Sequence, residues 1–213
     1  MKYSIEQIAQ LMIEDITKGI DYYDYTGPIV RRSEAKASVI KVSTSYGCIT
    51  EFEKRVIHAA ALAQAETQVA ISTHTQIGTM GIEQVELLKK FGANPEKIIV
   101  GHLQRNPDIW YHKKVADSGV SLMYDGGFRA KYAPDSTRMT LIKEMIDSGY
   151  QSQIVLGVDA GHASYQKAYG GGAGIDYDVS VFIPRMREEG ISNSAIKDLT
   201  INNPARLFSI KAE

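Results

Sequence analysis

Four polar residues of this chain each lie at or near the end of a short apolar segment. They are Lys41 in VIKVS (39 to 43), His74 in VAISTHT (69 to 75), His102 in IIVGHL (98 to 103) and Asp159 in IVLGVDA (154 to 160). Imidazole nitrogens and carboxylate oxygens are common zinc ligands, and a carboxylate can accept a proton from water during hydrolysis. If these side chains meet, they could bind a divalent metal ion and support hydrolysis.

The apolar segments are predicted to be parallel β-strands, because segments with helical spacing of apolar residues separate them. In a parallel α/β barrel the C-terminal strand ends converge on one mouth, so residues distant in sequence can share a site. We predict strands over residues 39 to 43, 69 to 75, 98 to 103, 120 to 125 and 154 to 159, and a short extended piece over 28 to 30. A first helix is predicted to begin after Ser4. Further helices are predicted over residues 51 to 66, 82 to 91, 107 to 118, 136 to 148, 178 to 189 and 193 to 199. Asn203 is predicted to cap a last helix that begins at Pro204.

Lys41 shares a strand face with Val39, which is predicted to point into the barrel. Burial lowers the pKa of a lysine ammonium, so the amine could react with carbon dioxide and bridge two metal ions as a carbamate. A lysine that extends from a sheet edge to solvent is an equally good interpretation.

The other three residues also have simpler interpretations. A single histidine at a strand end is more often a hydrogen-bonded structural residue, but His74 and His102 on successive strands favour metal ligation. Asp159 could bind metal and accept a proton from metal-bound water. The alternative is that it caps a following helix, and we favour the catalytic role.

Weaker candidates for contact with a substrate are His162, Tyr124 and Asp125. His162 follows Asp159 by three positions, and Tyr124 and Asp125 end the strand over 120 to 125. Turn chemistry at Asp125-Gly126-Gly127 is the commoner explanation for that aspartate. The long connection after Asp159 contains three consecutive glycines, 170 to 172, and is a candidate lid.

Composition favours one domain, residues 1 to 213, with 44% hydrophobic residues available for a core. The formal net charge of -1 removes the broad attraction that nucleic acids or anionic membranes exert on basic proteins. Cys48 is the only cysteine, the N-terminal segment carries acidic residues, and no stretch approaches about 18 uncharged apolar residues. We therefore predict a cytoplasmic protein with a small-molecule partner.

Several motifs together resemble the phosphotriesterase family of the amidohydrolase superfamily. They are IKVSTS (40 to 45), STHTQ (72 to 76), VGHLQRNPD (100 to 108), LGVDAG (156 to 161), FIPRMREEGIS (182 to 192) and TINNPARLF (200 to 208). The resemblance runs in order from about residue 4 to the C-terminus.

The resemblance implies a (β/α)8 TIM-barrel with a binuclear centre of zinc or another divalent metal. By motif, a carbamylated Lys41 would bridge the metals, His74 and His102 would bind the more exposed metal, and Asp159 would bind the more buried one and carry a proton away. A hydroxide made by the metals would attack a phosphotriester, a lactone or a related ester.

The chain departs from the family pattern because it contains no His-x-His pair, which the family carries on its first strand. Five strands also fall short of the eight of a closed barrel. We therefore expect an incomplete barrel that lacks the first strands and binds one or two ions. Its open strand edges favour association, so a homo-oligomer is expected.

Three hypotheses follow from these residues. The first is a metal-dependent hydrolase of phosphotriesterase type that acts on phosphoester, lactone or carboxylic ester bonds. The second is a non-catalytic barrel remnant that serves as an oligomerising interaction module. The third is an amidohydrolase that uses a single metal and Asp159.

Overall fold

The computed structural model describes residues 3 to 210 of the chain. At its centre is a five-stranded parallel sheet whose strands lie side by side in chain order. The strands are β1 (Val39–Thr44), β2 (Ala70–Thr75), β3 (Ile98–Gly101), β4 (Ser121–Tyr124) and β5 (Ile154–Leu156). All five predicted strands are confirmed, and the fold is the predicted incomplete (β/α)8 type. The extended piece over 28 to 30 is not a strand: within residues 18 to 38 the described pairing is one bridge between Asp21 and Arg32.

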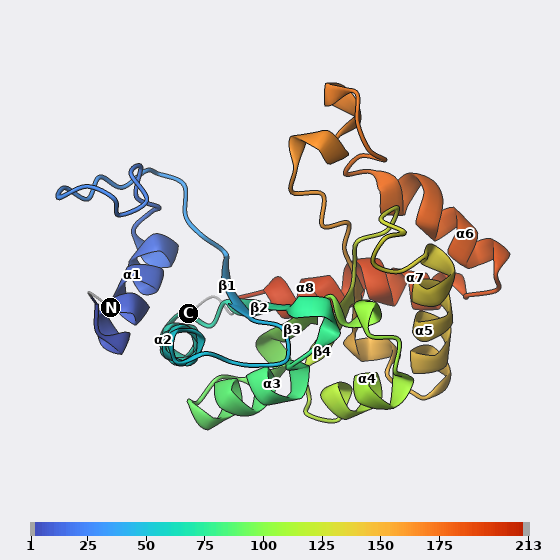
Figure 1. The fold of residues 1–213 in the computed structure, drawn as a ribbon, viewed down its shortest axis with the longest axis horizontal. Coiled ribbons are helices and arrows are strands. Elements are labelled where there is room, and N and C mark those ends of the chain that lie inside the picture. Colours follow the sequence, from blue (N-terminus) through green and yellow to red (C-terminus); the bar gives the residue numbers. More distant parts are fainter. Residues whose placement is uncertain (1–2, 211–213) are drawn as a thin grey trace.

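Helices alternate with the strands along the chain. They are α1 (Ile5–Thr17), α2 (Glu51–Thr67), α3 (Gly81–Lys90), α4 (Ile109–Ala116), α5 (Asp135–Asp147), α6 (Ile183–Glu188), α7 (Asn193–Lys197) and α8 (Asn203–Phe208). Helices α2 to α5 form an arc along one side of the sheet, and the connection after β5 projects away from it (Figure 1). No helix among residues 3 to 210 is long and apolar enough to cross a membrane.

The two faces of the sheet differ because side chains alternate along a strand. The outer face packs against the helices in one large apolar core, to which the strands contribute Ile40, Val42, Ile71, Ile98, Val100, Leu122 and Ile154. The opposite face, called the inner face here, carries Lys41 and His74. Its small apolar cluster combines Ala70, Ile99 and Val155 with Leu207 of α8. The polar site residues therefore belong to the face that the outer helices do not cover.

Asn203 does not cap a helix, so that prediction is wrong. It lies inside a continuous helical run from Asn193 to Phe208 that includes a π-helical turn, Asp198–Asn202. Its buried side-chain Nδ2 donates to the carbonyl oxygens of Gln151 (2.9 Å) and Ile154 (2.8 Å). The amide satisfies backbone acceptors at the start of β5, which a cap could not reach.

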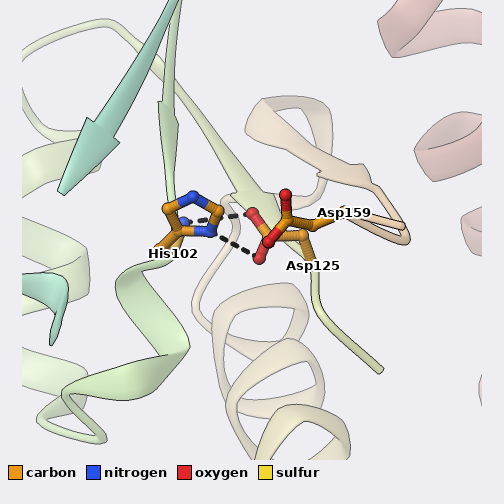
Figure 2. Close-up of side chains that lie close together, drawn as sticks. All are labelled: His102, Asp125 and Asp159. Atoms are coloured by element: carbon orange, nitrogen blue, oxygen red, sulfur yellow. Dashed lines mark hydrogen bonds and ion pairs between the residues drawn. The ribbon is translucent and has the colours of Figure 1, made fainter. Parts of the chain in front are cut away.

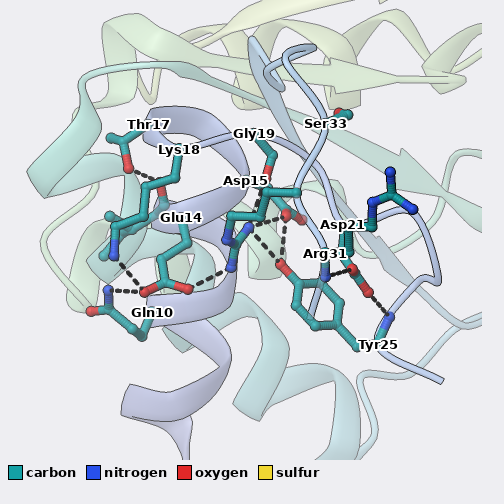
Figure 3. Close-up of polar contacts among 12 residues, drawn as sticks. Gln10, Glu14, Asp15, Thr17, Lys18, Gly19, Asp21, Tyr25, Arg31 and Ser33 are labelled. Carbon is teal, nitrogen blue, oxygen red and sulfur yellow. Dashed lines mark hydrogen bonds and ion pairs between the residues drawn. The ribbon is translucent and has the colours of Figure 1, made fainter. Parts of the chain in front are cut away.

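The segment between α1 and β1 has no hydrophobic period, yet polar contacts hold it against α1 (Figure 3). The guanidinium of Arg32 forms ion pairs with Glu14 and Asp15 of the helix. The buried carboxylate of Asp21 accepts the backbone N–H groups of Tyr25 (2.9 Å) and Arg31 (2.8 Å). Side-chain chemistry, rather than a strand or helix pattern, orders this loop.

Candidate metal centre

His74 lies at the end of β2 on the inner face, half-buried. Its Nε2 lies 2.8 Å from Oε1 of Gln76. With that oxygen as acceptor, Nε2 carries the hydrogen and Nδ1 keeps a free lone pair. The ring meets the ring of His102 edge-to-face, with 4.5 Å between centroids. Burial lowers the pKa of His74, and the positive charges of Arg105 and Lys41 act in the same direction. A neutral imidazole is the form that binds metal.

His102 follows β3 directly and is buried. Its backbone is left-handed, with φ of 67°, a conformation that costs energy for a residue with a Cβ. The backbone N–H and the ring Nδ1 both contact one carboxylate, that of Asp125, at 3.2 Å and 2.7 Å. Because a carboxylate only accepts hydrogen bonds, Nδ1 carries the hydrogen, and Nε2 is the ring nitrogen that can serve as a metal ligand.

Asp125 comes directly after β4 and is buried. Burial by itself raises the pKa of this carboxyl, but hydrogen bonds from His102 and Gln104 and the charge of Arg105 outweigh it and hold the pKa below its usual value. Gln104 donates to Oδ1 of Asp125 at 3.0 Å and to its backbone oxygen. The ionised aspartate thus fixes both the tautomer and the orientation of His102.

Asp159 lies beyond β5, also in a left-handed conformation, with φ of 52°. Ligand atoms of His102, Asp125 and Asp159 all lie within 4.8 Å of one another, and Figure 2 shows the three side chains facing each other from three strand ends. The Oδ2 atom of Asp159 accepts from two guanidiniums, those of Arg105 (3.3 Å) and Arg129. Sequence reasoning did not identify either arginine.

Lys41 lies on the inner face of β1, which is the edge strand of the described sheet, so the residue is exposed rather than enclosed. Its Nζ donates to the carbonyl oxygen of Thr73 at 3.1 Å. Partial desolvation of the ammonium lowers the pKa of Lys41, against the opposing charges of Asp125 and Asp159. The lysine borders solvent at the sheet edge, and its carbamylation stays a prediction.

The alternation of side chains along β4 places two of the weaker candidates, Tyr124 and Asp125, on opposite faces of the sheet. Tyr124 is fully buried on the outer face, where its hydroxyl contacts Nδ1 of His112 on α4 at 2.8 Å. That position removes it from the substrate side, which corrects the expectation of a pocket-lining tyrosine. Asp125, one position later, faces the site. His162 is exposed and packs edge-to-face on Tyr165, with ring centroids 5.2 Å apart.

The donor set fits a divalent ion. Nε2 of His102 and the carboxylate of Asp159 offer nitrogen and oxygen ligands of the kind zinc takes, and Nδ1 of His74 and Nζ of Lys41 lie on the neighbouring strands. Both arginine contacts of Asp159 use Oδ2, so Oδ1 has no hydrogen bond to the described part of the chain. The ligand atoms that lie close enough to hold one ion belong to His102, Asp125 and Asp159. The ring of His74 packs against that of His102 from β2.

The sequence model of the phosphotriesterase family matches residues 1–208. The chain belongs to the phosphotriesterase family. This family consists of divalent-metal-dependent hydrolases that act on small molecules, and the described part of this chain holds one group of side chains that could bind a metal ion, His102, Asp125 and Asp159.

Two curated relatives illustrate the similarity. A phospho-furanose lactonase of Mycoplasmopsis synoviae (strain 53) is 41% identical over 210 residues, which are 96% of this chain and 60% of that protein. The phosphotriesterase homology protein of Escherichia coli (strain K12) is 34% identical over 206 residues, which are 96% of this chain and 67% of that protein. The chain spans about 60% of the length of the lactonase relatives that it matches.

A solved structure gives the same result for the fold. The crystal structure of an amidohydrolase from Mycoplasma synoviae matches this phosphotriesterase-family chain with a TM-score of 0.95 at 40% identity. The match covers 100% of this chain and 62% of that one. The five strands described here thus correspond to part of a longer phosphotriesterase-family barrel.

Proposed function

We propose that this chain is a hydrolase of lactone or related ester bonds in which His74, His102 and Asp159 hold one divalent ion beside Lys41. The observation that carries the proposal is the convergence of His102, Asp125 and Asp159, from the ends of three different strands, within 4.8 Å. Zinc suits this set of donors. The names of the lactonase relatives favour a lactone as the substrate.

The chain's own residues have separate tasks in this proposal. When bound, the divalent ion supplies Lewis acidity, which polarises the substrate carbonyl and makes an attacking water more acidic. Asp125 accepts the Nδ1–H of His102, which fixes the ring and leaves Nε2 as the nitrogen offered to the ion. Asp159 accepts the proton of the attacking water at Oδ1, the oxygen that the arginines leave free, and passes it to the leaving alkoxide of the opened lactone.

Lys41 is the proposed site of carbamylation. Its lowered pKa raises the fraction of neutral amine, which is the form that adds to carbon dioxide with loss of a proton. The resulting carbamate would place a carboxylate-like group beside His74. A second ion would need further ligands, because the described residues offer only Lys41 and Asp159 on that side.

The open sheet edges favour a second candidate role, association with another polypeptide. Strands β1 and β5 each pair with only one neighbour in the described part of the chain. Unpaired parallel edges bind other strands readily. We propose that the protein is a homo-oligomer in the cytoplasm. If the chain binds no metal ion, we propose that it is a non-catalytic interaction module.

Metal content and lactone hydrolysis test the proposed function together. The protein is purified without chelator, and elemental analysis is expected to find about one divalent ion per chain. His102→Ala should lose both the ion and the turnover of a γ-lactone. His58→Ala is the matched control, because that ring stacks on Phe91 at a centroid distance of 3.9 Å and lies on α2, not at a strand end. Absence of bound metal in the wild type, or equal metal content in the two variants, would overturn the proposal.

A further inference from the structure

The connection between β5 and α6 forms a compact body that projects from the sheet (Figure 1). Its residues 160 to 176 are called the flap here. The backbone N–H of Gly174 donates to the carbonyl oxygen of Tyr165 at 2.9 Å. Nζ of Lys167 forms an ion pair with Oδ2 of Asp176 at 2.7 Å. These contacts join the outgoing limb of the flap to the returning limb.

The glycines at the tip of the flap allow close packing. A Cβ on Gly171 would overlap the carbonyl oxygen of Ser164, and a Cβ on Gly172 would overlap that of Tyr165. Gly172 also has a φ of 56°, a left-handed conformation that glycine adopts at little cost. The two limbs therefore pack directly on each other, and we expect the flap to move as one body.

The returning end of the flap is anchored to the first turn of α5. The hydroxyl of Tyr177 donates to Oδ2 of Asp135 at 2.5 Å. Nη2 of the buried Arg138 donates to Oδ1 of Asp178 at 2.8 Å. The outgoing end follows Asp159, whose φ is 52°. One end of the flap is thus fixed, whereas the other begins at a candidate site residue.

Phe128, in the loop between β4 and α5, contacts both the flap and its anchor. Its ring meets that of Tyr165 edge-to-face at a centroid distance of 5.6 Å and that of Tyr177 at 5.5 Å. The backbone of Phe128 is left-handed, with φ of 61°. This conformation is rare and costly for a bulky residue and persists only where the surroundings hold it. The two ring contacts hold Phe128 in this conformation.

The residue after Phe128 links the flap to the candidate metal centre. Arg129 donates to Oδ2 of Asp159, and its side chain is only 8% exposed. Its guanidinium lies 5.5 Å from the centroid of the Tyr165 ring. Because Phe128 and Arg129 are adjacent, a displacement of the Phe128 backbone moves the guanidinium as well. The position of Arg129 on Asp159 therefore depends on whether Phe128 keeps its contacts with the flap.

We propose that Phe128 is a positioning residue that latches the flap to the loop after β4 and so keeps Arg129 on Asp159. The cost of the strained backbone and the gain from two aromatic pairs are of similar size. The latched and released states therefore lie close in free energy, and a ligand that binds one of them better shifts their populations. The effect on hydrolysis rests on the proposed function, whereas the latch itself does not.

The rate of arginine modification by phenylglyoxal, followed by peptide mass spectrometry, tests the latch in metal-free protein. Phe128→Ala should raise the rate at Arg129 about threefold to tenfold, which is the range expected for the loss of aromatic pairs. Phe128→Tyr keeps the ring and should react like the wild type. Phe52→Ala, which removes an exposed ring on α2, is the matched control. Equal rates at Arg129 in Phe128→Ala and in the wild type would overturn the proposal.

A pair of variants at Tyr177 gives a second and independent measurement. Tyr177→Leu and Tyr177→Phe both remove the hydrogen bond to Asp135, but only Tyr177→Leu removes the ring that Phe128 contacts. Arg129 should react about threefold faster in the leucine variant than in the phenylalanine variant. Equal rates would mean that Arg129 is held without the latch, and would overturn the proposal even if Phe128→Ala did not fold.

Two further measurements separate the latch from unfolding and from the proposed function. Arg138 is only 1% exposed, so its modification should stay slow in every folded variant. At equal zinc content, Phe128→Ala should turn over a γ-lactone about tenfold or more slowly than the wild type, because a catalytic group is misplaced. Equal turnover would overturn the positioning role. If zinc binds to neither protein, the proposed function fails, while the metal-free modification rates still decide whether the latch exists.

Discussion

Nδ1 of His102 lies 2.7 Å from Oδ1 of Asp125, and both side chains are buried. The pair joins residues that follow two neighbouring strands, and it occupies Nδ1, so Nε2 is the ring nitrogen left for another partner (Figure 2). The parallel pairing of β3 with β4, with Gly101 opposite Met123, brings the two positions close, and the direction of each side chain completes the contact.

Asp125→Asn should weaken metal binding without removing a ligand. The amide cannot stabilise a hydrogen on Nδ1 as a carboxylate does, and loss of such a partner typically costs about 10-fold to 100-fold in metal affinity. Zinc affinity is measured by competition with a chromophoric chelator. Asp147→Asn, an exposed change on α5, serves as the control, and equal affinities for both variants would refute the role of Asp125.

His112→Phe should destabilise the fold, and it replaces none of the candidate metal ligands. The buried ring of His112 contacts the Tyr124 hydroxyl at 2.8 Å, and its Nε2 donates to the carbonyl oxygens of Leu103 (3.0 Å) and Asn106 (2.8 Å). Phenylalanine fills the volume but leaves the Tyr124 hydroxyl and the two carbonyl oxygens without this hydrogen-bond partner. The free energy of unfolding should fall by on the order of 3 kcal/mol. Urea denaturation gives the free energy of unfolding. His58→Phe, which keeps a ring beside Phe91, should cost much less.

The same histidine predicts a pH dependence of stability. Burial lowers the pKa of His112 in the folded state, whereas an unfolded histidine titrates near about 6.5. Its stabilising contribution is therefore complete above about pH 6.5 and is lost as the pH falls toward the lower folded value, because the unfolded chain then binds more protons. The free energy of unfolding should drop less between pH 7.5 and pH 5.5 in His112→Phe than in the wild type. An identical drop would contradict the assignment.

Asn203→Ala should destabilise the attachment of α8 to β5. The change removes two donors and leaves the carbonyl oxygens of Gln151 and Ile154 without that partner in a buried position. A loss of about 1 to 3 kcal/mol in the free energy of unfolding is expected. Asn202→Ala, which removes an exposed hydrogen bond to Asp198, should cost only a few tenths, and a reversed order of the two variants would disprove the account.

Gly101→Ala should also destabilise the protein, because no space exists for a side chain at this point of the sheet. A Cβ there would lie 2.8 Å from the carbonyl oxygen of Thr73 and 3.1 Å from Cε of Met123. The expected cost is about 1 to 3 kcal/mol, as for other overpacked sites. Thermal unfolding of Gly161→Ala, where nothing lies within 4 Å, provides the comparison; equal melting temperatures would show that the sheet adjusts freely.

The strands, the helices and the placement of Lys41, His74, His102 and Asp159 in or soon after parallel strands follow from the sequence. Hydrophobic periodicity is local information, and parallel strands must end at one edge of the sheet. The extended piece over 28 to 30 and the cap at Asn203 were wrong. Residues 28 to 30 belong to a loop in which Asp21 binds the backbone N–H groups of Tyr25 and Arg31, and the side chain of Asn203 binds a carbonyl oxygen of β5.

The sequence by itself determined the helices and strands and the residue types near the C-terminal ends of the strands. Only the tertiary structure decided the partners: Asp125 for His102, two arginines for Asp159, and the helix-covered face for Tyr124. Arg105 and Asp159 are 54 positions apart, and Tyr124 differs from Asp125 by one step of the strand alternation. Such contacts depend on register and side-chain direction across the sheet, which no local pattern of residues contains.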